Sequence, residues 1–362
     1  MNAFLRNYRL WLDRSFKALV LMGLLYVLHR EIGGRDQLLP LWHALLQQLK
    51  GEGKWWLLPA LLLMPVNWGL ESEKWRRLLR GFWRVAPWPA FRAVAAGITL
   101  SLFTPNRVGD YGGRVLAVPA AHNWQAVLAT MAGNMAQLIA LLSGGLAGTL
   151  YYLQTQAGLP QLLISSFWWL LAVGLLLVYI FYFNLNRLAS WIQLLPLPKK
   201  WRERIAHLGQ FNRQQLGAAL LLAFARYGVY CLQYLLLTRF FGIDAPALAG
   251  LSGIAAIFLF QATVPLPPVA ALLARGEAAL IIWGPFTDNE LSILAATFGL
   301  FILNLAFPAL LGMAFIVKIN VLKSLGYETN APENERNSLS PSPAARQHGP
   351  RADEPGASRH GT

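Results

Sequence analysis

The stretch TPNRVGDYGGR, residues 104–114, ends an apolar run that is too short to cross a membrane. That run, residues 93–103, has only eleven residues, whereas a spanning helix needs about 20. Backbone that breaks at membrane depth is tolerated only where protein or a water-filled cavity surrounds it. We therefore expect residues 93–123 to form a re-entrant hairpin that lines a functional cavity.

The composition of the 362-residue chain is that of a polytopic membrane protein. Hydrophobic residues make up 56% of it and charged residues only 13%. The net charge of +14 would suggest nucleic acid in a soluble protein, but here the basic residues collect between apolar runs, so no nucleic-acid partner is expected. The single cysteine, Cys231, excludes internal disulfides and thiolate metal sites. No nucleotide-binding, catalytic or metal-ligand motif is present, so no cofactor is expected.

Six apolar runs are predicted to cross the membrane, as a domain over residues 1–323. Six arginines and lysines between residues 74 and 92 give the strongest orientation signal, which places both termini in the cytoplasm. Residues 38–49 have the spacing of an amphipathic helix, expected on the outer surface. Residues 324–362 are predicted to be a disordered cytoplasmic tail. The six runs are residues 15–29, 55–71, 126–152, 162–183, 214–241 and 291–317.

A second broken segment follows residue 247 and contains Pro265 and Pro267. An offset of 159 residues aligns Asn67-Trp68-Gly69 with Arg226-Tyr227-Gly228, and Trp75 with Tyr234. Each unit then contains a span, a broken hairpin and a span, in opposite orientations, as in transporters with inverted repeats. We expect repeats at about residues 55–152 and 214–317, joined by a connector helix at 162–183. Chance similarity between two apolar segments is the alternative.

Arg226 lies near the middle of an apolar run and has no acidic neighbour in its own helix. Because a charge at membrane depth is costly, it either binds an anion such as a lipid phosphate or pairs with a buried acid. The candidate acids are Asp110, Glu71 and Glu277. For Glu71, an interfacial pair with Lys74 is the simpler interpretation, and for Glu277 it is neutralisation by Arg275.

Within the first hairpin, Arg107, Asp110 and Arg114 share one face if a helix begins near Val108. The start of that helix would direct its positive dipole end at an anion, and three glycines would allow close approach of a helix or a head group. A local ion pair is the alternative. The predicted substrate-binding residues are Arg107, Asp110, Arg114, Arg226, Glu277 and Glu71, and the predicted hairpin residues are Thr104, Pro105, Asn106, Gly109, Gly112, Gly113, Pro265 and Pro267.

Three motifs carry a resemblance to a known family: TPNRVGDYGGR, the preceding NWGLESEKWRRLL and the later VPLPPVAALLARGEAAL. With these, residues 10–320 resemble the lysylphosphatidylglycerol synthase transmembrane family, also described as flippase-like membrane proteins. The third motif keeps the prolines and Gly276-Glu277 of the PxPGGLGxxE form but lacks its paired glycines. The resemblance implies a bacterial inner-membrane domain that moves lipids, typified by flipping of aminoacylated phosphatidylglycerol. No soluble aminoacyltransferase domain is expected, so enzymatic synthesis is not predicted.

These observations predict an all-α membrane protein that translocates a phospholipid or a lipid-linked sugar by alternating access, without ATP. In the expected mechanism Arg226, Arg107 and Arg114 hold the head group, and Asp110 and Glu277 compete for these arginines when the site is empty. One alternative is a non-catalytic subunit that docks a synthase through residues 72–92 and 184–213. Another is a lipid glycosyltransferase, which would need external acids; Glu31, Asp36 and Glu52 are isolated and interleaved with bases.

Overall fold

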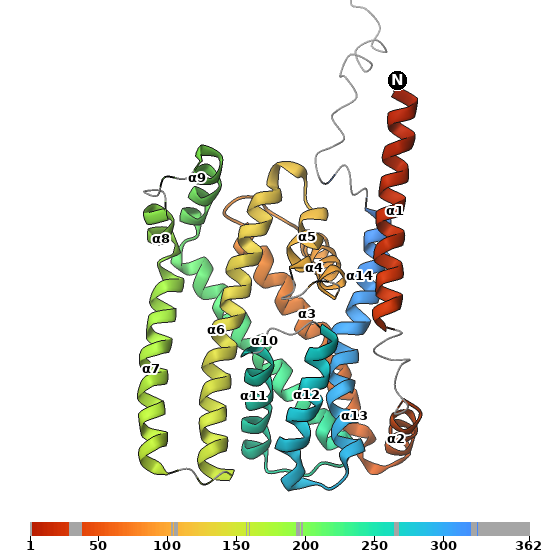
Figure 1. The fold of residues 1–362 in the computed structure, drawn as a ribbon, viewed down its shortest axis with the longest axis vertical. Helices are drawn as coiled ribbons and strands as arrows, with labels where there is room; N and C mark the ends of the chain where they lie inside the picture. The colour runs from red at the N-terminus through yellow and green to blue at the C-terminus, as the bar shows by residue number, and fades with distance from the viewer. Residues whose placement is uncertain are drawn as a thin grey trace, which may run out of the picture. The chain divides into compact units, whose positions relative to one another are not determined.

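The protein is helical throughout the described part of its computed structural model, where no strand occurs (Figure 1). Residues 1–326 form one compact unit. The predicted all-α membrane fold is therefore confirmed. The predicted disordered tail, apart from Ser324, lies outside the described residues. Those residues are 2–28, 38–102, 104, 108–156, 158, 160–192, 196, 198–263, 268–319 and 324.

The α-helices follow one another with short connections. Their bounds are α1 Asn2–Leu28, α2 Leu38–Lys50, α3 Leu57–Leu79, α4 Pro87–Ser101, α5 Gly109–Leu116, α6 Asn123–Gln156, α7 Gln161–Phe183, α8 Leu185–Ile192, α9 Lys199–Ala206, α10 Arg213–Phe240, α11 Ala247–Thr263, α12 Pro268–Trp283, α13 Glu290–Phe301 and α14 Phe307–Lys318. Short 3-10 helices η2 Glu52–Trp56, η4 Ala120–His122, η5 His207–Gln210 and η6 Gly284–Phe286 lie between them, and the π-helix η7 Ile302–Ala306 joins α13 to α14.

Four of the six predicted spans are long and apolar enough to cross a membrane: Ala120–Gln156, Gln161–Phe183, Arg213–Phe240 and Glu290–Lys318. The other two lie in α1 and α3, which have 27 and 23 residues. Charged residues lower the mean hydropathy of both helices, so their crossing stays a prediction. The predicted amphipathic helix is α2, which packs against α13.

A pair of short helices flanks each predicted break, and residues 103, 105–107 and 264–267 within the breaks lie outside the described residues. In the first, α4 has 15 residues and α5 has eight, and the two pack closely against each other. At 1.5 Å per residue α4 is about 22 Å long, less than the roughly 30 Å hydrocarbon core. It begins six residues earlier than the predicted leg, because Pro87 supplies a favourable first helical residue. In the second, α11 with 17 residues packs against α12 with 16.

Two glycines of the first motif allow the tight packing of α5 on α4. A Cβ atom on Gly109 would lie 2.1 Å from the carbonyl oxygen of Leu100, and one on Gly113 would lie 2.4 Å from the backbone of Ala96. The predicted close approach is thus confirmed at these positions. At Gly112 the nearest atom would be 3.7 Å away, so that glycine does not determine the packing.

The centre of the protein is the contact between α3 and α10, the first helices of the two predicted repeats (Figure 1). Each makes a matching hydrogen bond to a later helix of its own unit. The indole nitrogen of Trp75 donates to Thr130 in α6 at 3.1 Å, and the hydroxyl of Tyr234 bonds Thr297 in α13 at 2.6 Å. Trp75 and Tyr234 are aligned by the 159-residue offset, but their partners Thr130 and Thr297 are not, so the inverted repeat stays a prediction.

Candidate functional site

Five buried charged side chains meet where α3, α5 and α10 come together, and we call them the charge network: Glu71, Lys74, Asp110, Arg114 and Arg226. Each is at most 6% exposed. Glu71 is its centre, because its carboxylate lies 2.7 Å from Lys74 Nζ, 2.8 Å from Arg114 Nη2 and 3.2 Å from Arg226 Nη1. One carboxylate therefore holds cations from three helices.

The hairpin joins this network through Arg114. Its Nε donates to Asp110 Oδ1 at 2.8 Å and its Nη2 to Asp110 Oδ2 at 2.9 Å, so the two residues form a fork one turn apart on α5. The guanidinium also lies 5.7 Å from the ring of Trp75. The start of α5 is held separately, since the amide of Gly109 donates to Thr104 Oγ1 at 2.6 Å.

Arg226 is held by α3, α6 and its own helix. Its Nη1 donates to Gln137 Oε1 at 3.2 Å, and the same oxygen accepts from Lys74 Nζ at 3.4 Å. The guanidinium lies 5.3 Å from the ring of Trp68 and 5.2 Å from that of Tyr230. Its Nε is buried and has no hydrogen-bond partner among the described residues. One donor of the central arginine is therefore free for another acceptor.

The network contains three cations and two carboxylates, so it carries one excess positive charge. An uncompensated charge in a buried site costs several kcal/mol, which is more than most single contacts supply. An anion, or loss of the Lys74 proton, would neutralise it. A phosphate group fits the donors, because a guanidinium can give a phosphate two parallel hydrogen bonds.

Four of the six predicted binding residues are brought together here: Glu71, Asp110, Arg114 and Arg226. Three acids were predicted as possible partners of Arg226, and in the structure Arg226 pairs with Glu71. The expected interfacial pair of Glu71 with Lys74 exists, but it is buried. Arg107 lies outside the described residues, as do Pro105, Asn106, Pro265 and Pro267 of the predicted hairpins.

The expected pairing of Glu277 with Arg114 or Arg226 is wrong, because these two described arginines bind Glu71 and Asp110 instead. Glu277 is exposed on α12, which packs mainly against α11 and α13. Its neighbour Arg275 donates to Gln261 of α11. A charged residue within an apolar run is therefore not buried here, because its helix presents that face away from the protein interior.

A second polar network is formed by amide side chains. Asn67 donates to Asn304 at 2.6 Å, Asn304 donates to Gln233 at 2.7 Å, and Gln233 donates to the carbonyl of Ala60 at 2.8 Å. Asn304 belongs to the π-helix, and such helices are frequent at functional sites. These amides connect α3, α10 and the junction of α13 with α14. An amide side chain within an apolar run is typical of such interhelical hydrogen bonds.

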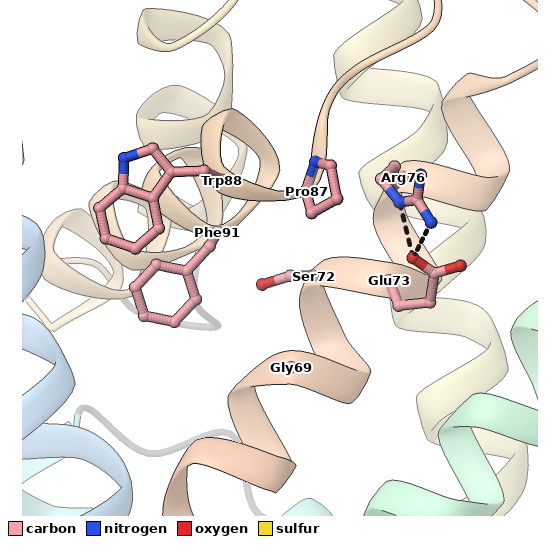
Figure 2. Close-up of a pocket in the computed structure, with 7 residues that line it drawn as sticks. All are labelled: Gly69, Ser72, Glu73, Arg76, Pro87, Trp88 and Phe91. Carbon is pink, nitrogen blue, oxygen red and sulfur yellow. Dashed lines mark hydrogen bonds and ion pairs between the residues drawn. The ribbon is translucent and has the colours of Figure 1, made fainter.

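A pocket of about 380 Å³ opens on another face of α3 (Figure 2). Gly69, Ser72, Glu73 and Arg76 form its α3 side, and the rings of Trp88 and Phe91 form the α4 side. Glu73 is neutralised by Arg76 and Arg77, both at 2.6 Å. The pocket is amphipathic, and the arginines that pair with its one acid are partly exposed, so their charge is hydrated, unlike that of the buried network.

The sequence pattern of the family described as "Lysylphosphatidylglycerol synthase TM region" matches residues 16–312. The chain belongs to this family. The match includes α3, α5, α6 and α10, so the charge network lies within the lysylphosphatidylglycerol synthase transmembrane region itself. No curated protein and no solved structure matched the chain in the corresponding comparisons.

Proposed function

We propose that this protein moves a phospholipid or a lipid-linked sugar across the bacterial inner membrane, with both of its termini in the cytoplasm. The observation that carries the proposal is the excess positive charge of the charge network. Ionisable side chains are energetically costly inside a membrane protein. Those that are present commonly mark the pathway of a transported substrate or ion. A phosphate on the lipid head group would supply the missing negative charge.

Glu71 occupies the position that the phosphate would take. Its carboxylate already bridges Arg114 and Arg226, at 2.8 and 3.2 Å. A phosphate entering between the two guanidiniums would compete with Glu71 and would also reach the free Nε of Arg226. Lys74 would remain with Glu71, so the displaced carboxylate would keep one partner.

The same exchange gives a route to alternating access. The Arg114–Glu71 contact ties the hairpin α4–α5 to α3, and Arg226 ties α10 to the same carboxylate. Loosening both contacts would free the hairpin relative to the crossing of α3 and α10. In this proposal the chain is a carrier and no bond in the lipid is broken. Because no ATP motif is present, a gradient, the membrane potential or removal of the product would drive net movement.

Translocation by the purified chain tests this proposal. Proteoliposomes of phosphatidylcholine would carry fluorescent phosphatidylglycerol in both leaflets, and a membrane-impermeant reductant would report the fraction that reaches the outside. Arg226→Gln should abolish protein-dependent movement, whereas Arg77→Gln, which removes a charge from α3 outside the network, should not. If Arg226→Gln moved the lipid as fast as the unaltered protein, the site assignment would be wrong.

The docking alternative has one supporting feature. Helix α9 exposes Lys199, Lys200 and Arg202 at the end of the protein where the basic loops gather. An acidic surface of a synthase could bind there. Co-purification of a synthase that is lost in Lys199→Gln/Lys200→Gln, with no lipid movement by the isolated chain, would favour docking over transport.

A further inference from the structure

A second basic pocket, of about 480 Å³, lies away from the charge network, between the beginning of α4, the segment after α5 and the end of α14. We propose that it binds the phosphate group of an anionic phospholipid from the adjacent leaflet. The site is separate from the proposed transport site, and it stands even if the protein moves no lipid.

The pocket is lined by two cationic side chains and by no acidic residue. Arg92 comes from the second turn of α4 and Lys318 from the last turn of α14, and none of the ten lining residues is acidic. Among the described residues no salt bridge neutralises either cation. The guanidinium of Arg92 lies 5.7 Å from the ring of Phe315, which positions it and leaves its charge available.

The remaining lining favours a lipid over a free phosphate ion. Trp83, Pro89, Leu116 and Pro119 contribute apolar surface next to the two cations. Trp83 is fixed by stacking on His122, with the ring centroids 5.3 Å apart. Cations beside apolar surface match a lipid, whose phosphate adjoins its glycerol and acyl carbons. Basic pockets between helices are a known means of binding anionic lipid head groups.

The pocket also lies at the appropriate end of the protein. The pocket residue Trp83 stacks on His122, and two residues later Trp124 donates to the carbonyl of Arg204 in the basic helix α9 at 2.9 Å. The pocket and α9 therefore lie on one side of the molecule. By the positive-inside rule that side faces the cytoplasm, where the leaflet is rich in anionic lipids.

A lipid bound in the pocket would restrain the hairpin formed by α4 and α5. Leu116 lines the pocket two residues after Arg114, the residue that connects α5 to the charge network. A phosphate that bridges Arg92 and Lys318 would therefore fasten α4 to α14 beside the end of α5. Anionic lipid in this pocket is expected to stabilise the folded protein.

Thermal unfolding of the full chain in mild detergent tests the site, with the unfolding temperature followed while phosphatidylglycerol is added. All variants carry Arg226→Gln, so that binding to the charge network does not contribute. Arg92→Gln/Lys318→Gln should need about 30-fold more phosphatidylglycerol for the same shift in unfolding temperature. One basic residue near an anionic surface changes the affinity about fivefold, and the double substitution removes two. Lys199→Gln/Lys200→Gln removes the same charge from α9 and should respond like its parent.

Three controls test whether the response needs a negatively charged head group, acyl chains and the cations of the pocket. Phosphatidylcholine should give no shift, and glycerol phosphate, which has the head-group chemistry without acyl chains, should give none at the same concentration. If the double substitution does not fold, Lys318→Gln alone, in the same Arg226→Gln background, should weaken the response about fivefold. An undiminished response in the pocket variants, or an equal response to glycerol phosphate, would overturn the proposal.

Discussion

Replacing Glu71 by Gln keeps the volume of the central side chain but removes the charge on which the network depends. The variant would hold three buried cations and one carboxylate, and Lys74 and Arg226 would lose their only carboxylate partner among the described residues. Breaking a buried ion pair from one side costs about 3–5 kcal/mol. We expect Glu71→Gln to lower the free energy of unfolding by an amount of that order.

Unfolding in mixed micelles with increasing denaturing detergent would measure the loss. Glu73→Gln is the matched control: it removes a carboxylate two residues away whose partners Arg76 and Arg77 are partly exposed, and such pairs contribute under about 1 kcal/mol. Adding Arg226→Gln to Glu71→Gln restores the original net charge, so it should recover part of the loss, with a coupling of about 0.5–3 kcal/mol. The reasoning is refuted if Glu71→Gln costs no more than Glu73→Gln, or if Arg226→Gln adds to the loss.

Three further predictions concern the packing, the amide network and the topology. Gly113→Ala should destabilise the protein by about 1–3 kcal/mol through overpacking against α4, whereas Gly112→Ala should have little effect; equal unfolding midpoints would contradict the hairpin packing. Asn304→Ala should cost about 1–2 kcal/mol because it leaves two buried amides short of a partner, and an unchanged midpoint would count against that network. In a background without the native cysteine, a cysteine at Gly158 should react with an impermeant thiol reagent from outside intact cells and one at Lys199 should not; the reverse pattern would invert the topology.

The first hairpin could be predicted because its signals are local. An eleven-residue apolar run followed by proline, charge and glycine cannot continue as a span, whatever surrounds it. The same stretch predicts close packing at all three of its glycines, but it does not distinguish Gly112, which the packing does not require, from Gly109 and Gly113. The earlier beginning of α4 was missed because residues 87–92 include Arg92 and two prolines, which do not resemble an apolar helix.

The partners of Arg226 could not be read from the sequence, because they depend on which helices cross. Glu71 lies 155 positions earlier in the chain, and only the contact of α3 with α10 brings the two together. Glu277 fits the same sequence description as Glu71 but lies on a helix face that is exposed. Gln137 lies in an apolar run, and its hydrogen bonds with Lys74 and Arg226 depend on where α6 packs.

A structure of the protein in nanodiscs rich in phosphatidylglycerol would test the central claim most directly. We predict phosphate density within about 3 Å of the Nε of Arg226 and of the guanidinium of Arg114, with the Glu71 carboxylate displaced toward Lys74. If both arginines still bound Glu71 and lipid phosphate occupied only the pocket of Arg92 and Lys318, the charge network would be structural and the proposed transport site would be contradicted.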